Sequence, residues 1–172
     1  MDEKNRQTDS FLSSQKALEG KLNDMLNELT DTESERYLRV KSQKESYTEH
    51  AEIVMYRYTN GSGRLFGGAL LQMIDTIGAI CARRHAGTEV TTVAIDNLSF
   101  KAPANLNSTI LLVAQVVSVG RTSMKVVVKT YVEELNGHRD EINVANMTFV
   151  ALDRFGLPTP VPRLLEQEAA KS

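Results

Sequence analysis

The sequence contains little cysteine, histidine or tryptophan. Cys81 is the single cysteine among 172 residues, and tryptophan is absent. One cysteine cannot form a disulfide within the chain, and its position in an apolar stretch favours packing over chemistry. The three histidines lack the spacing of metal ligands, so we predict no metal site. A Gly-x-Ser-x-Gly elbow is also missing, which argues against a serine hydrolase.

Neither sign of charge is in large excess, and long hydrophobic runs are absent. The formal net charge is −2, which predicts no bulk attraction to nucleic acid or to a membrane. The apolar run from Ala69 to Ala82 is too short to span a bilayer and is interrupted by Gln72 and Asp75. Residues 1–7 are charged and lack the apolar centre of a signal peptide. We therefore expect a cytoplasmic protein.

The sequence patterns that are present predict one helix and several strands. The segment from about Phe66 to His85 is apolar on nearly every side, so we expect a central helix that is buried all round. Segments rich in Val, Ile, Thr and Phe predict strands at 49–59, 90–100, 109–119, 122–135 and 141–152. Asn136-Gly137 predicts a hairpin with a type I′ turn. One helix followed by antiparallel strands indicates an α+β fold, with the helix on one face of the sheet.

The first 47 residues form a separate part of the predicted organisation. An apolar stripe at near-heptad spacing predicts an amphipathic helix there, made of Phe11, Leu18, Leu22, Met25 and Leu29. We interpret residues 1–47 as a helical extension that packs on the domain or on a neighbouring subunit. Residues 48–163 are the predicted main domain, and residues 164–172 are a C-terminal tail.

The segment from Asn60 to Asp75 carries the clearest signal for chemistry. Gly67 and Gly68 place bare backbone N–H groups at the start of the predicted helix, where the helix dipole favours an oxyanion. A buried carboxylate such as Asp75 is costly unless it has partners. A structural interpretation is that Asp75 caps a loop or lies at a polar subunit contact. The adjacent glycines favour a catalytic role instead.

These residues also resemble a known active site. They lie in the string Asn-x-x-Gly-x-Leu-Phe-Gly-Gly-x(6)-Asp, which is similar to the active-site segment of hotdog-fold acyl-CoA thioesterases of the broad-range hydrolase branch. Further similar strings stand at 90–96, 100–104, 120–124 and 158–162, so the resemblance covers residues 48–163. The chain departs from the pattern at Asn107-Ser108, where many relatives have Gly-Asp, although this pair also favours a turn.

The resemblance implies hydrolysis of fatty acyl-CoA to a fatty acid and CoA. The Gly67 amide would polarise the thioester carbonyl, and Asp75 would act as general base or as nucleophile, two alternatives that the sequence leaves open. Asn60 would position the reactants and reach the aspartate of the partner subunit across a dimer. The implied assembly is a homo-oligomer with shared active sites, a hexamer built as a trimer of dimers.

The remaining candidates concern substrate binding. Gly68 would let the substrate approach, and Thr92 is either a support for the site or a plain strand residue. CoA carries phosphates, so cations should line the entrance, and Lys101 and Arg121 are the candidates within the resembling strings. No cofactor is expected beyond the CoA of the substrate.

The main alternative is an acyl-CoA-binding transcriptional regulator with a hotdog ligand domain. Residues 1–50 hold eight Lys or Arg against eleven Asp or Glu, a net charge of −3. This sign is wrong for binding to DNA phosphates. A hotdog dehydratase would need a catalytic histidine, and none stands near the Gly-Gly segment. The enzyme interpretation, with no nucleic-acid partner, is therefore preferred.

Overall fold

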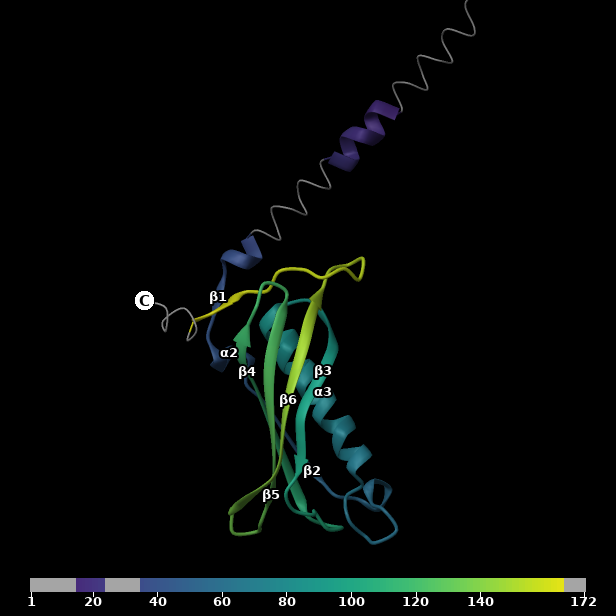
Figure 1. Cartoon of the computed structure of the whole chain (residues 1–172), viewed down its shortest axis with the longest axis vertical. Coiled ribbons are helices and arrows are strands. Elements are labelled where there is room, and N and C mark those ends of the chain that lie inside the picture. The colour runs from purple at the N-terminus through teal and green to yellow at the C-terminus, as the bar shows by residue number, and fades with distance from the viewer. Residues whose placement is uncertain (1–14, 24–34, 166–172) are drawn as a thin grey trace, which may run out of the picture. The chain divides into compact units, whose positions relative to one another are not determined.

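The computed structural model describes residues 15–23 and 35–165 (Figure 1). Its contacts divide the chain into two units, Met1–Arg36 and Tyr37–Ser172, which are described separately. Within the first unit residues 15–23 are helical, and Leu18 and Leu22 are exposed on that helix. Phe11, Met25 and Leu29 of the predicted stripe lie outside the described residues.

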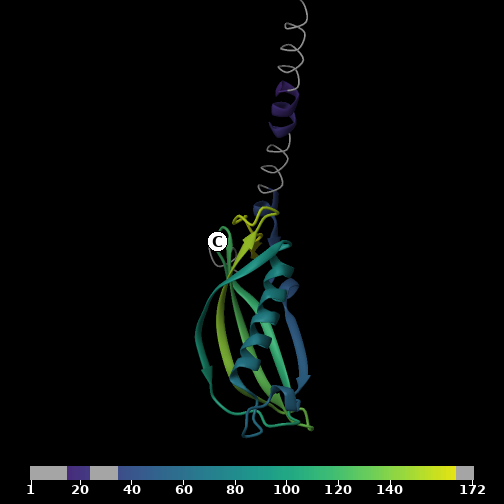
Figure 2. The ribbon, with the colours of Figure 1, turned by 90° about the vertical axis from the view of Figure 1, so that its right-hand side faces the viewer.

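The second unit is built on a five-stranded antiparallel sheet with strand order β2-β4-β5-β6-β3. Its strands are β2 (Thr48–Ile53), β3 (Glu89–Phe100), β4 (Thr109–Val119), β5 (Ser123–Glu133) and β6 (Arg139–Leu152). The long helix α3 (Gly67–Ala86) lies on one face of this sheet, and the strands curve round it (Figure 2). This arrangement confirms the predicted α+β class.

The core lies between α3 and the inner face of the sheet. Along β5 the buried side chains alternate at Met124, Val126, Val128 and Thr130, which is the pattern of a strand with one face in the core. A Cβ on Gly78 would lie 2.9 Å from Met147 Sδ and 3.0 Å from Phe149 Cζ of β6. Gly78 therefore lets the helix approach its own sheet closely.

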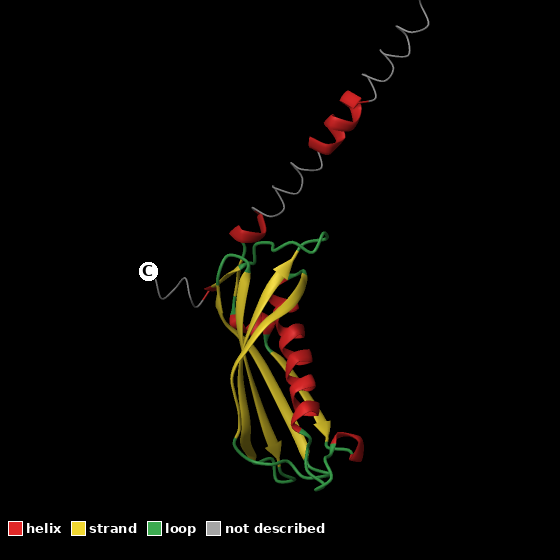
Figure 3. Cartoon of the chain, turned by 45° about the vertical axis from the view of Figure 1, so that its right-hand side comes forward, coloured by secondary structure: helices red, strands yellow, loops and turns green. Residues whose placement is uncertain are grey.

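Helix α3 is not buried on all sides, contrary to the prediction. Gln72 and Thr76 are exposed, and Ile80 keeps 40% of its surface accessible. The sheet covers one side of the helix, and the side that faces away from it stays open in the single chain (Figure 3). Among the described residues, no helix is both long and apolar enough to cross a membrane.

Two turns show how local sequence shapes the fold. At the β5–β6 connection the Glu134 N–H donates to His138 O at 2.8 Å, and Gly137 has a φ of +85°. Asn136 is not among the described residues with positive φ, so the predicted type I′ turn is wrong. In the three-residue loop Gly137 N donates to Glu134 O at 2.9 Å, and the single left-handed residue is the glycine at the end of the turn. At the other turn, Asn107 adopts a φ of +68°, and Ser108 N donates to Asn105 O at 3.1 Å.

The segment after β2 departs from the predicted strand and forms the approach to α3. The predicted strand at 49–59 ends at Ile53, and Tyr56–Tyr58 form a short 3-10 helix, η1. The Phe66 N–H then donates to Tyr58 O at 2.8 Å, which brings the chain back to the start of α3. Gly87, with a φ of +70°, ends that helix.

Residues 39–46 belong to the second unit and contribute two small elements to it. Strand β1 (Val40–Lys41) pairs in parallel with β7 (Arg163–Leu164), and the short helix α2 (Gln43–Ser46) follows it. Ser46 is fully buried, and Arg163 N donates to Arg39 O at 2.9 Å. To test the N-terminal extension, residues 1–36 should therefore be deleted, so that the shortened protein keeps both β1 and α2.

Candidate active site

The first part of the site is the N-terminus of α3. Gly67 is the first residue of this helix, so its backbone N–H has no acceptor within the helix and lies at the positive end of the helix dipole. The preceding loop is fixed by the bond from Leu65 N to Ala104 O at 2.8 Å. A donor held in this way is suited to bind an oxyanion.

The two adjacent glycines have different surroundings. A Cβ on Gly67 would lie 3.6 Å from the ring of Phe100, an ordinary contact. A Cβ on Gly68 would lie only 2.6 Å from the ring of Phe66. The space beside Gly68, which the sequence assigned to the approach of the substrate, is therefore occupied by an aromatic side chain of the same chain.

Asp75 and Thr92 form the second part of the site. Thr92 Oγ1 on β3 donates to Asp75 Oδ1 on α3 at 2.7 Å. Asp75 is half-buried, and Thr92 is exposed on β3, which is an edge strand of the sheet. The structure thus places the predicted support beside the predicted carboxylate. One carboxylate oxygen is fixed by the threonine while the group stays open to one side.

Asn60 lies in the loop before α3. Its Oδ1 accepts hydrogen bonds from Ser62 N at 2.9 Å and from Arg64 N at 3.2 Å, so the side chain closes a turn of its own loop. The backbone bridge between Thr59 and Leu65 keeps this turn close to the start of the helix. Asn60 and Gly67 are therefore at the same end of α3.

Asp75 lies further along the helix than these two residues. It stands eight positions after Gly67 in α3, which corresponds to about 12 Å along the helix axis. A carbonyl bound at the Gly67 N–H of one chain is consequently out of hydrogen-bond reach of Asp75 of the same chain. The single chain presents two half-sites, Asn60 with Gly67 and Asp75 with Thr92.

A cavity of about 300 Å³ begins at the first half-site. Its wall runs from Gly67 past Phe100 to Lys101 and then along the residues that follow β3. The remaining lining residues are Leu65, Leu70, Ala102, Pro103, Ala104 and Ile142. The structure therefore brings the predicted residues Gly67 and Lys101 to one cavity.

Lys101 is ion-paired in this structure. Its Nζ donates to Glu141 Oε1 on β6, and this hydrogen bond holds the pKa of the Glu141 carboxyl below its ordinary value. Neither Glu141 nor Phe100 was a site candidate from the sequence. Phe100 opens one of the strings of the family resemblance, so the pattern contained a signal for it, whereas Glu141 had none.

Arg121 lies far from Lys101 within one chain. Thr122 O, next to Arg121, accepts from Ala151 N at 2.9 Å, while Lys101 N donates to Ile142 O at 2.8 Å. The stretch of β6 between Ile142 and Ala151 spans roughly 30 Å. The two predicted phosphate ligands are therefore at opposite ends of the sheet, and one chain cannot present both to the same phosphate group.

Cys81 lies on the side of α3 that faces the hydrophobic core, away from both half-sites. It is fully buried, and this burial raises the pKa of its thiol to about 11 from an ordinary value of 9.0. The thiol therefore stays protonated at pH 8, and we expect the folded protein to react very slowly with a disulfide reagent at that pH. Absorbance at 412 nm should report about one reactive thiol per chain in denaturant. Rapid reaction of the folded protein would contradict the burial.

Comparison with known proteins places the chain in a family. The thioesterase superfamily pattern matches residues 62–136. A Bacillus subtilis protein named as an uncharacterized acyl-CoA thioester hydrolase is 38% identical over 125 residues, 72% of this chain and 73% of that protein. The chain therefore belongs to the thioesterase superfamily, and the predicted hotdog fold and thioester hydrolase class are confirmed.

Solved structures agree with this assignment. An acyl-CoA hydrolase variant from Staphylococcus aureus in complex with coenzyme A has a TM-score of 0.72 and 35% identity, covering 74% of this chain and 77% of that chain. An apo-hexameric acyl-CoA thioesterase has a TM-score of 0.72 and 34% identity, covering 77% of this chain and 88% of that one.

The solved variants of the Staphylococcus aureus enzyme share a pattern with this chain. They replace an asparagine, an aspartate and a threonine with alanine, and these three residues are separated by 15 and then 17 positions. Asn60, Asp75 and Thr92 have the same two separations. The residue types and spacings of the two half-sites therefore coincide with positions selected for substitution in a similar enzyme.

Proposed function

We propose that this chain hydrolyses acyl-CoA thioesters, including fatty acyl-CoA, to a carboxylic acid and CoA. The observation that carries the proposal is the pair formed by Thr92 and Asp75, in which a hydroxyl donates to a half-buried carboxylate beside an edge strand. The helix N-terminus at Gly67 supplies the complementary element, a free amide donor. The similar enzymes act on acyl-CoA by name, which supports the same substrate class here.

Each active site combines residues of two chains. About 12 Å of helix separates Gly67 from Asp75, so a thioester bound at Gly67 needs the aspartate of a second chain. Strand β3 is at the edge of the sheet and Asp75 lies beside it, so pairing two β3 edges would bring the second aspartate to the seam. Two-fold symmetry then creates two equivalent sites per dimer.

The chemistry follows from these positions. The Gly67 N–H stabilises the negative charge that develops on the carbonyl oxygen, and the helix dipole adds to this stabilisation. Asp75 of the other chain either takes a proton from the attacking water or attacks the carbonyl carbon itself. Thr92 fixes Oδ1, which leaves Oδ2 for this role. The carbon–sulfur bond breaks, and the CoA thiolate leaves and takes up a proton. Where Asp75 has attacked directly, a water molecule then hydrolyses the acyl-aspartate anhydride, which releases the carboxylic acid and restores the carboxylate.

Asn60 positions the reactants, and the dimer is the minimal active assembly. Oδ1 of Asn60 is engaged within its own loop, so its Nδ2 is the group that would donate across the seam. Three such dimers would give a hexamer, the assembly named for one of the similar structures.

A thiol-release assay tests the proposal. Purified protein is mixed with acyl-CoA esters from acetyl to palmitoyl, and free CoA is followed with a disulfide reagent. We expect saturable turnover with a preferred chain length. Absence of CoA release from every ester, by protein shown to be folded and assembled, would refute the proposed function.

A further inference from the structure

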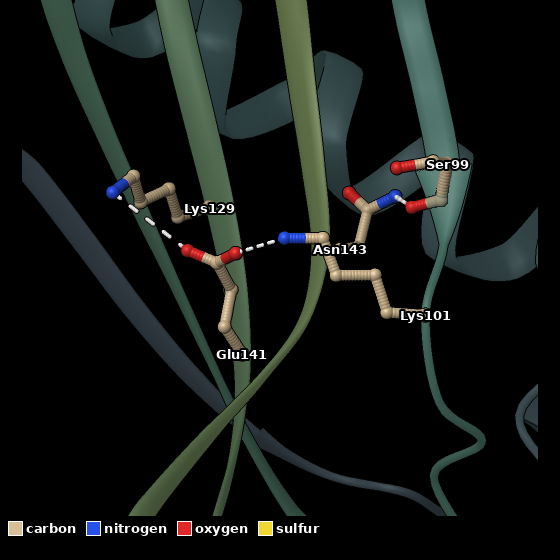
Figure 4. Close-up of polar contacts among 5 residues, drawn as sticks. All are labelled: Ser99, Lys101, Lys129, Glu141 and Asn143. Carbon is tan, nitrogen blue, oxygen red and sulfur yellow. Dashed lines mark hydrogen bonds and ion pairs between the residues drawn. The ribbon is translucent and has the colours of Figure 1, made fainter.

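Three charged side chains meet on the face of the sheet that points away from α3 (Figure 4). Glu141 on β6 receives a hydrogen bond from Lys101, and its other carboxylate oxygen lies 3.7 Å from Nζ of Lys129 on β5. Two ammonium groups thus share one carboxylate. The cluster of Lys101, Lys129 and Glu141 has a net charge of +1.

The backbone that carries Lys101 is held in place. Asn143 is fully buried, and its Nδ2 donates to Ser99 O at 2.6 Å, two residues before Lys101. Lys101 N itself donates to Ile142 O at 2.8 Å. Figure 4 shows the lysine side chain extending from this anchored point toward Glu141. The cluster is therefore a defined arrangement rather than three independent surface charges.

The two lysines remain accessible to a soluble anion. Their side chains are 50% and 48% exposed, and that of Glu141 is 28% exposed. Ion pairs with this degree of exposure contribute little to stability, so a competing anion displaces them easily. The Glu141 carboxyl, whose pKa is lowered by the hydrogen bond from Lys101, is ionised at neutral pH. An incoming phosphate consequently meets two attractive charges and one repulsive charge.

The position of the cluster matches the chemistry of an acyl-CoA ester. In that molecule a long pantetheine arm separates the thioester from the phosphates, so the phosphate site must lie beyond the cavity and not at Gly67 itself. The cavity wall leads from Gly67 past Phe100 to Lys101. Lys101 belongs both to the cavity wall and to the cluster, and Glu141 on β6 and Lys129 on β5 lie beside it on the outer face of the sheet.

Resting on the proposed function, we infer that Lys101 and Lys129 bind the phosphates of the nucleotide end of acyl-CoA, and that Glu141 is a specificity-determining residue for that end. In the free protein Glu141 forms ion pairs with both ammonium groups, so it competes with the phosphates for them. Arg121 takes no part within the same chain because it lies at the opposite end of the sheet.

The test compares one acyl group on two carriers. Wild type, Glu141→Gln and Lys129→Ala are assayed with an acyl-CoA and with the same acyl group on pantetheine, which lacks the nucleotide. Binding of adenosine 3′,5′-bisphosphate is measured separately by calorimetry. Two control variants change similar groups outside the cluster. Glu133→Gln removes a carboxylate that pairs with Arg139 at 2.6 Å, and Lys125→Ala removes an exposed lysine four residues before Lys129 on the same strand, β5.

We expect Glu141→Gln to lower the KM for acyl-CoA by about threefold to tenfold, the size of one charge interaction near a protein surface. Lys129→Ala should raise that KM by a similar factor, and the affinity for the bisphosphate should change in parallel. The KM for acyl-pantetheine and both controls should stay within about twofold. Salt should weaken each difference.

Two results would overturn the inference. One is an equal change of KM for acyl-CoA and acyl-pantetheine, which would mean that Glu141 only shapes the cavity wall. The other is a bisphosphate affinity that is the same in wild type, Glu141→Gln and Lys129→Ala. Because calorimetry needs no turnover, this second result is distinguishable from a failure of the proposed hydrolysis.

Discussion

Replacing Asp75 with asparagine is expected to lower acyl-CoA turnover by about 100-fold or more, as happens when a general base or nucleophile is lost. The asparagine side chain keeps an oxygen that can accept the hydrogen bond from Thr92 Oγ1, so the local geometry should persist. An amide cannot take a proton from water at neutral pH and is a poor nucleophile. The loss should therefore appear in kcat with little change in folding.

The measurement is kcat from thiol release together with circular dichroism and size-exclusion chromatography. Asp140→Asn is the matched control, because Asp140 is an exposed carboxylate beside His138 at the start of β6. This control should retain wild-type turnover. Near wild-type activity in a folded, assembled Asp75→Asn protein would remove Asp75 from the chemistry.

Much of the fold could be predicted from the sequence because its elements have strong local patterns. The strand at 109–119 was predicted with the bounds of β4, and the predicted helix differs from α3 by one residue at each end. In each case a clear signal marks one end of the apolar segment, the Asn107-Ser108 turn before the strand or Gly87 after the helix. Local patterns of this kind require no knowledge of distant contacts.

Other parts of the fold depend on contacts that the sequence pattern does not contain. The parallel pairing of Val40–Lys41 with Arg163–Leu164 joins segments from the two ends of the domain, and each is only two residues long. The predicted burial of α3 on all sides was wrong because one sheet covers only one side of a helix. An apolar residue such as Ile80 indicates that its position is buried, but it does not indicate which element or which chain buries it.

The same distinction applies to the candidate site. Asn60, Gly67 and Asp75 lie within one short string, so their grouping could be predicted from the sequence. The predicted helix contains both Gly67 and Asp75, so their separation of about 12 Å along the helix axis also follows from the sequence. The pairing of Lys101 with Glu141 joins residues 40 positions apart through the β3–β6 register, so it became visible only in the structure.

The separation of the two half-sites leads to a prediction about mixed dimers. If Asn60 and Gly67 of one chain act with Asp75 of the other, two inactive variants can complement each other. Refolding equal amounts of Asn60→Ala and Asp75→Asn chains together should give mixed dimers in which one of the two sites has both wild-type residues. With random assortment half of the dimers are mixed, so about a quarter of full activity should return.

A matched control separates complementation from other effects of mixing. When Asn60→Ala chains are refolded with chains that carry both Asn60→Ala and Asp75→Asn, every site lacks Asn60, and no activity should return. Both mixtures are assayed by thiol release, and native mass spectrometry reports the fraction of mixed dimers. If mixed dimers form but the first mixture stays as inactive as its parents, Asn60 and Asp75 act within one chain, and the shared-site arrangement is wrong.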